Sequence, residues 1–200
     1  MDLTGKYPIR SARGNQYILV AYNYDANAIL AEPVPNKQAR TLTDAFETMH
    51  KKFAKAGVAP STWILDNEKS GTLMEAFEKY EVTHQLVPPR THRANKAERA
   101  IQTFKEHFKT GLDLVHPKFP AKQWDRLIPQ AIMTLNMLRS SRLNPKLSAH
   151  AHLFGEFNFA ATPLLPPGTH VIAHHAPEDR ATWDLNGEKG WYVGPSNDHY

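Results

Sequence analysis

The chain has 200 residues, of which 41% are hydrophobic and 22% charged, as is typical of a folded globular protein with one sizeable core. It has no cysteine, which excludes disulfides and thiolate metal sites and indicates a nuclear or cytoplasmic, that is intracellular, protein. We find no apolar run near the roughly 20 residues of a membrane helix and no signal-peptide character, so we expect no membrane association. The net charge of +4 favours a polyanionic partner only weakly.

The first half of the chain alternates between strand and helix patterns. Apolar runs such as YILVAY are typical of strands buried on both faces, and apolar residues at helical spacing precede a plausible C-cap at Gly57. The predicted elements are strands at 17–22 and 28–34, a helix at 39–57, a strand at 61–65, a helix at 71–81 and a strand at 82–87. This order predicts a mixed α/β sheet flanked by helices.

The second half begins with a helical pattern from Asn95 onward. Its buried stripe is predicted to contain Ala97, Ile101, Phe104 and Phe108, and a more exposed stripe Glu98, Gln102, Lys105 and Lys109. A further helical stretch covers residues 121–139, which Pro129 should kink or divide.

The last part of the chain changes character. The stretch 162–168 is rich in turn residues, and the aromatic-rich stretch after it predicts a small β appendage. We expect Asn186-Gly187 to form the turn of a hairpin, and Trp183 and Trp191 to pack on each other across it.

Three acidic residues stand where an α/β sheet forms its sites: Asp2 at the start of the chain, Asp66 at the end of a strand and Glu98 near the start of a helix. Carboxylates gathered at one place repel each other unless cations join them, and such sites hold divalent metals that assist phosphodiester chemistry. Each acid could also have a structural role in place of binding metal. Asp66 could cap a turn, Glu98 could pair with basic neighbours on a solvated face, and Asp2 could be a frayed terminal residue.

The motifs DLTG (2–5), ILDNE (64–68) and NKAER (95–99), in this order, resemble the Asp, Asp, Glu signature (the DDE motif) of retroviral and retrotransposon integrase cores. Segments further along, including NPKLSAHAHLFG and GWYVGPSNDHY, are similar to copia-type retrotransposon polyproteins. The resemblance covers nearly the whole chain. It implies a ribonuclease H-like mixed sheet flanked by helices, with a small C-terminal β extension.

The resemblance also implies an activity: a polynucleotidyl transferase that trims DNA 3′ ends and joins them to target DNA, using two Mg²⁺ or Mn²⁺ ions. Asp2, Asp66 and Glu98 would be the catalytic metal ligands. The residues expected to contact DNA are Arg93, Asn95, Lys96, Arg99 and Lys105. The expected partners are element ends, target DNA and further copies of the chain.

The expected organisation is an integrase core at 1–142 with a truncated first strand, a linker at 143–168, and an incomplete β-rich extension at 169–200. Lys96 stands where the family has glycine, so the backbone there lacks glycine's freedom. Two alternatives remain open: a non-catalytic DNA-binding or assembly remnant of an integrase, and a ribonuclease H-like nuclease that cuts without joining.

Overall fold

The computed structural model describes residues 1–66, 71–87 and 96–195, and within these the side chains of residues 66, 86–87 and 96–97 are left undescribed. The strands are β1 (Asp2–Leu3), β2 (Tyr17–Asn23), β3 (Ala28–Val34), β4 (Thr62–Asp66), β5 (Thr83–Val87), β6 (His170–His174) and β7 (Gly187–Trp191). The helices are α1 (Ala39–Lys55), α2 (Gly71–Lys79), α3 (Lys96–Asp113), α4 (Ile128–Met137) and α5 (Ala149–Phe154), with 3-10 helices η2 (Ala121–Leu127) and η3 (Pro177–Asp179).

Two small sheets lie side by side, and we refer to them together as the main sheet. β1, β2 and β3 form an antiparallel group in that order, and β4 and β5 form a parallel pair. The N-terminal amine of Met1 donates a hydrogen bond of 2.7 Å to the carbonyl oxygen of Ile64, which brings the edge of β1 beside β4. The mixed α/β architecture expected from the sequence is therefore confirmed.

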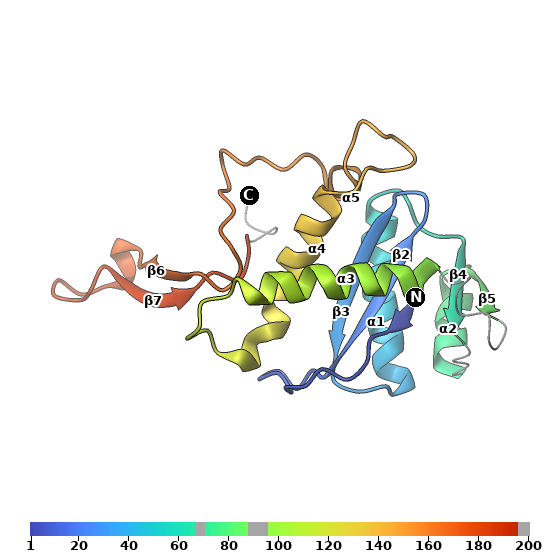
Figure 1. Ribbon diagram of the computed structural model, residues 1–200, viewed down its shortest axis with the longest axis horizontal. Helices are drawn as coiled ribbons and strands as arrows, with labels where there is room; N and C mark the ends of the chain where they lie inside the picture. The colour runs from blue at the N-terminus through green and yellow to red at the C-terminus, as the bar shows by residue number, and fades with distance from the viewer. Residues whose placement is uncertain (67–70, 88–95, 196–200) are drawn as a thin grey trace.

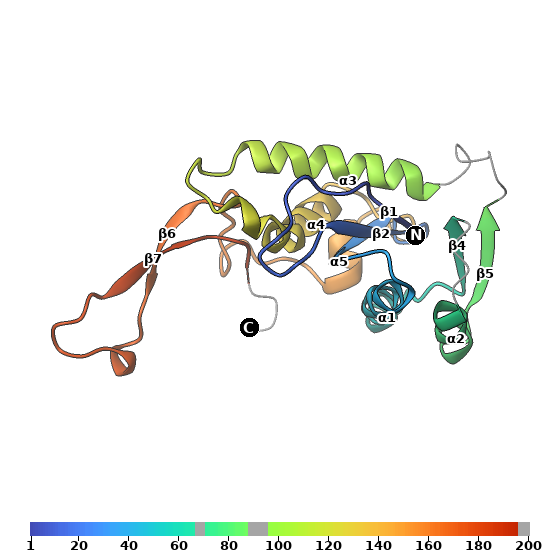
Figure 2. The same ribbon diagram turned by 90° about the horizontal axis from the view of Figure 1, so that it is seen from below.

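Helices cover both faces of this sheet. Figure 2 shows α3 on one side of β1 and β2 and α1 on the other, with α2 next to α1 and β5. The core between these layers is apolar and aromatic. Its largest fully buried side chains include Phe46, Phe53, Phe77, Phe104 and Trp124.

The strands and helices of the first half lie close to the residues where the sequence predicts them. β2 buries Ile18, Leu19, Val20 and Ala21, as a continuous apolar run predicts. Gly57 follows α1 with φ +72°, and the N–H of Val58 bonds the carbonyl of Phe53, so this helix ends in the Schellman arrangement. Residues 121–139 divide at Pro129 into η2 and α4, as predicted.

Two predictions about the C-terminal appendage are wrong. β6 and β7 do form an antiparallel hairpin, but Gly187 is the first residue of β7, and the connection spans residues 175–186 with η3 inside it. Trp183 lies in that connection with 97% of its surface exposed and does not pack on Trp191. Trp191 contacts the rings of His170 and Phe119 instead, because β7 meets the segment that follows α3.

The hairpin β6–β7 projects away from the rest of the molecule (Figure 1). The segment 143–168, expected to be a linker, contains the short helix α5, capped by Ser148, whose Oγ accepts the N–H of Ala151. Among the described residues, no helix combines the length and the apolar character needed to cross a membrane.

Candidate active site

Asp2 lies in β1, at the edge of the antiparallel group and next to β4. It is paired with Val20 of β2 on one side, and its neighbour Met1 bonds Ile64 of β4 on the other. One carboxylate oxygen, Oδ1, accepts the backbone N–H of Leu3 at 2.7 Å. The backbone of Asp2 is therefore paired within a strand, in contrast to the alternative of a frayed terminal residue.

Asp66 is the last residue of β4, in register with Val87 of β5. Because Met1 contacts Ile64, two residues before Asp66, β1 and the carboxyl end of β4 are neighbours, and adjacent strands lie about 4.8 Å apart. The backbone therefore brings Asp2 and Asp66 onto adjoining strands. The direction of the Asp66 side chain lies outside the described residues.

Glu98 is exposed in the first turn of α3. That helix is held on the sheet by Ile101, Phe104 and Phe108, all buried, so the predicted stripes are confirmed at these positions. In both views the N terminus of the chain lies beside the first turn of α3 and beside β4 (Figures 1 and 2). The fold thus gathers the backbone of all three predicted acids at one end of α3.

The N-terminal amine has unusual electrostatics for a terminal group. Burial lowers its pKa from 8.0 to about 6, and the Asp2 carboxylate opposes this shift only in part. Near neutral pH the amine is therefore mostly uncharged and adds little positive charge to offset Asp2.

The predicted DNA-contacting residues are only partly described. Arg99 is exposed and Lys105 partly buried on α3, and Lys96 is the first residue of that helix, with its side chain undescribed. Arg93 and Asn95 lie in the segment 88–95, outside the described residues. The described side chains include no group of three His, Asp or Glu residues placed to hold a metal ion; the Asp66 carboxylate is not among them.

Solved structures with a similar fold are catalytic cores of retroviral integrases. Two are the integrase catalytic core domain of HTLV-2 in complex with magnesium. The dimeric form is 19% identical (TM-score 0.52, 74% of this chain and 91% of that chain), and the trimeric form 18% identical (TM-score 0.53, 76% and 95%). The catalytic core domain of BIV integrase is 12% identical, with a TM-score of 0.53 over 76% of this chain and 91% of that chain. The expected ribonuclease H-like fold is confirmed.

The sequence comparisons match a different class of protein from the structure comparisons. RNA polymerase-binding protein RbpA of Mycolicibacterium smegmatis and that of Mycobacterium tuberculosis are each 34% identical over 110 residues, which is 54% of this chain and 92% or 95% of theirs. No model of a protein family matches the chain.

The two likenesses disagree about activity and cover different lengths. The match to RbpA covers 110 residues. The layered core is longer, since it runs from Asp2 in β1 to Met137 in α4, so the match cannot span all of it. The integrase likeness covers 74% of this chain, although at this identity it concerns the fold alone. By the identity and coverage of the matched segment, the chain belongs by sequence to the family of RNA polymerase-binding protein RbpA, while its fold is that of integrase catalytic cores.

Proposed function

We propose that the chain is the catalytic core of an integrase from a copia-type retrotransposon, which trims DNA 3′ ends and joins them to target DNA. The observation that carries the proposal is the hydrogen bond from Met1 to Ile64, which sets β1 beside β4. With α3 packed on the sheet, this bond puts the backbone of Asp2, Asp66 and Glu98 at one end of the sheet. The DDE order of these acids and the integrase-like fold support the same activity.

Asp2, Asp66 and Glu98 would hold two Mg²⁺ or Mn²⁺ ions, since carboxylate oxygens are the ligands these ions prefer. When bound, such ions activate the attacking oxygen and stabilise the leaving oxygen of a phosphodiester. The HTLV-2 neighbours are described in complex with magnesium, which agrees with this metal. β1 fixes the backbone of Asp2, and the buried face of α3 fixes that of Glu98.

Cationic side chains around the acids would position the phosphate backbone. Arg99 and Lys105 lie on α3, and Arg93, Asn95 and Lys96 flank its first turn in sequence. Contacts of this kind supply affinity and register but little sequence information. The HTLV-2 neighbours are described in dimeric and trimeric forms, and we propose that this chain also self-associates.

A DNA-joining assay tests the proposal. A labelled donor duplex and a plasmid target are incubated in Mn²⁺ with the chain and with its Asp66→Asn and Glu98→Gln variants. Both variants should lose joining by about 100-fold or more, because a missing metal ligand removes several kcal/mol of charge stabilisation. Glu106→Gln is the matched control: this exposed acid on α3 accepts a hydrogen bond from Gln102 at 3.2 Å, and its loss should leave joining unchanged.

Each other outcome favours a named alternative. Cleavage without joining that depends on Asp66 indicates a ribonuclease H-like nuclease. DNA binding without any cleavage indicates a non-catalytic remnant of an integrase.

A second candidate function rests on the sequence match to RbpA, a protein named for binding RNA polymerase. Under this alternative the chain would bind a polymerase and need no metal. Co-purification with mycobacterial RNA polymerase holoenzyme would separate the two candidates. Polymerase binding that survives Asp66→Asn, with no joining in Mn²⁺, would favour the second.

A further inference from the structure

A group of exposed cations lies away from the candidate active site. It is built by two segments, 4–16 and 114–126, which lie toward the C-terminal end of α3, whereas Glu98 is in its first turn (Figures 1 and 2). We call this group the basic patch. Its members are Lys6, Arg10, Arg13, Lys118, Lys122 and Arg126, all exposed.

Hydrogen bonds and a ring contact join the two segments, so the patch has a defined shape. The N–H of Ala12 donates to the carbonyl oxygen of Lys122 at 2.7 Å, and the indole N–H of Trp124 donates to the carbonyl oxygen of Ile9 at 2.8 Å. The ring of Tyr7 stacks on Trp124 with centroids 4.1 Å apart. Trp124 is buried and forms the anchor beneath the patch.

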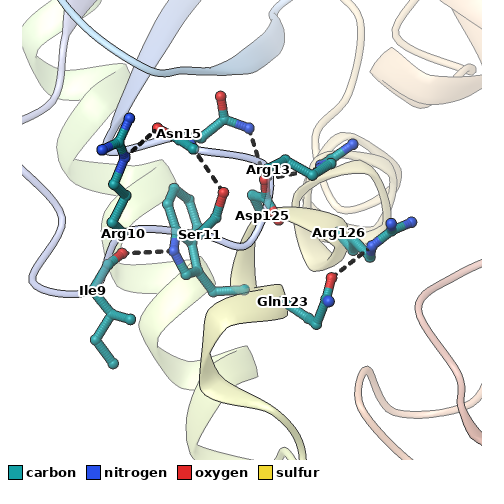
Figure 3. A network of polar contacts seen from close by, with 10 residues as sticks. Ile9, Arg10, Ser11, Arg13, Asn15, Gln123, Asp125 and Arg126 are labelled. Carbon is teal, nitrogen blue, oxygen red and sulfur yellow. Dashed lines mark hydrogen bonds and ion pairs between the residues drawn. The ribbon is translucent and has the colours of Figure 1, made fainter.

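The only acidic residue in the two segments is turned inward. Asp125 is fully buried, and its Oδ2 accepts hydrogen bonds from Arg13 Nε at 2.9 Å and from Asn15 Nδ2 at 2.7 Å (Figure 3). Its charge is balanced inside the protein by Arg13. The exposed charged side chains that these two segments contribute are therefore all cations.

Two guanidinium groups are held in place. Arg10 Nε donates to the carbonyl oxygen of Gly14 at 3.1 Å, and Arg126 Nε donates to Gln123 Oε1 at 2.7 Å (Figure 3). The terminal nitrogens of a guanidinium held through Nε can still donate to an anion. Among the described residues, no ion pair involves Lys6, Lys118 or Lys122.

The patch accounts for the positive charge of the whole chain. Of the 24 Lys and Arg residues and the 20 Asp and Glu residues, six and one respectively lie here, which leaves 18 basic and 19 acidic residues elsewhere. The rest of the protein is thus close to neutral, and the weak basic character of the composition is concentrated on one surface.

We propose that the basic patch binds the phosphate backbone of duplex DNA at a surface separate from the candidate active site. A dense cluster of Lys and Arg without acids matches the regular negative charge of a duplex, which carries one charge per about 1.7 Å of its axis. The choice of DNA over another polyanion rests on the proposed function. Binding at the patch requires neither a metal ion nor Asp66.

The test measures the binding of a labelled duplex by fluorescence anisotropy in EDTA over a range of salt concentrations. The triple variant Lys6→Gln, Lys118→Gln, Lys122→Gln leaves the internal bonds of the patch intact. It should reduce the slope of log K against log salt by about 0.9 for each phosphate that the variant no longer neutralises, and weaken binding about 10-fold or more. The matched control removes the same charge elsewhere, at three exposed lysines: Lys55, Lys146 and Lys189.

Equal losses in the two triple variants would overturn the proposal, because net charge alone would then explain binding. An unchanged slope in the patch variant would overturn it too. So would a loss of binding to anionic lipid vesicles in the patch variant, with duplex binding kept. Asp66→Asn should bind duplex DNA in EDTA like the unmodified chain, so failure of the metal site and failure of the patch give different results.

Discussion

Asp125 shows how a single residue far from the candidate active site stabilises this fold. Burial alone would raise the pKa of its carboxyl, but hydrogen bonds from Asn15, Ser11 and Arg13 lower it below its usual value. The ionised form is therefore the one the native state prefers. This carboxylate ties η2 to the segment between β1 and β2, more than a hundred positions away in sequence.

We predict that Asp125→Ala lowers the free energy of unfolding by roughly 2–3 kcal/mol, because Asn15 and Arg13 lose their buried acceptor. Because the native pKa is lowered, the stabilisation is present above the unfolded pKa of about 3.9 and is lost as pH falls toward the native pKa. Urea denaturation at pH 7 and at pH 3.5 measures both effects. Asp44→Ala, at an exposed position of α1, should change stability by less than about 0.5 kcal/mol; an equal loss there would contradict the account.

At the scale of elements, Asn136 joins α4 to the edge of the sheet. Its side chain is fully buried, and it accepts the N–H of Ile29 at 2.9 Å and donates to the carbonyl oxygen of the same residue at 2.8 Å. This pair of bonds satisfies the backbone N–H and C=O of Ile29 in β3 as a further strand would. The helix therefore protects an edge that could otherwise pair with another chain.

Asn136→Leu should lower the free energy of unfolding by roughly 2–4 kcal/mol, since both backbone groups of Ile29 would be left buried and unpaired. It should also increase aggregation, measured by light scattering. Asn144→Ala is the matched control, because the exposed Asn144 side chain accepts a local loop bond from the N–H of Lys146. If Asn136→Leu were no more harmful than the control, the bonds to β3 would not matter to stability.

The hairpin β6–β7 contains two glycines that respond differently to a methyl group. A Cβ on Gly187 would lie 2.5 Å from the carbonyl oxygen of Ala173, whereas a Cβ on Gly190 would meet nothing within 4 Å. We predict that Gly187→Ala speeds amide hydrogen exchange in β6 and β7, while Gly190→Ala does not. Thermal unfolding of the core should be unchanged in both; equal exchange in the two variants would contradict the prediction.

The sequence predicts β2, β3 and α3 well because their apolar spacing is local. Two ring partners of Trp191, His116 and Phe119, are not local: they lie on the segment after α3, and no pattern within 169–200 indicates them. The Asn186-Gly187 signal misplaces the turn, because Gly187 pairs with His174 as the first residue of β7. The sequence does indicate half of the basic patch, because residues 4–16 contain three cations and no acid. It does not indicate that this segment packs against the distant Trp124, which completes the patch.

For the molecule as a whole, the sequence shows the order of the three acids along the chain. It does not show that their backbones lie close together in the fold. This proximity depends on the contact between Met1 and Ile64, which joins the two groups of strands into one surface. Sequence spacing cannot show that contact, because it depends on how the strands align. The same contact links stability to pH through the buried amine of Met1.

The folded amine has a pKa of about 6 against 8.0 in the unfolded chain, so between these values the unfolded state binds more protons. Stability should therefore rise from pH 6 to pH 8, by roughly 1–2 kcal/mol after allowance for solvent screening. An N-terminally acetylated chain keeps an N–H for Ile64 but has no titrating amine, so its stability should rise less over this range than that of the unmodified chain. Chemical denaturation of both forms across pH 5.5–8.5 makes the comparison; the same rise in the acetylated chain would contradict the account.

The central claim is that Asp2, Asp66 and Glu98 form one divalent-metal site. Isothermal titration calorimetry with Mg²⁺ and Mn²⁺ tests it most directly, on the unmodified chain, on Asp66→Asn and on Asp113→Asn, an exposed acid at the far end of α3. We expect metal binding that is lost or strongly weakened in Asp66→Asn and kept in Asp113→Asn. Absence of binding in the unmodified chain, or equal binding in all three, would contradict it.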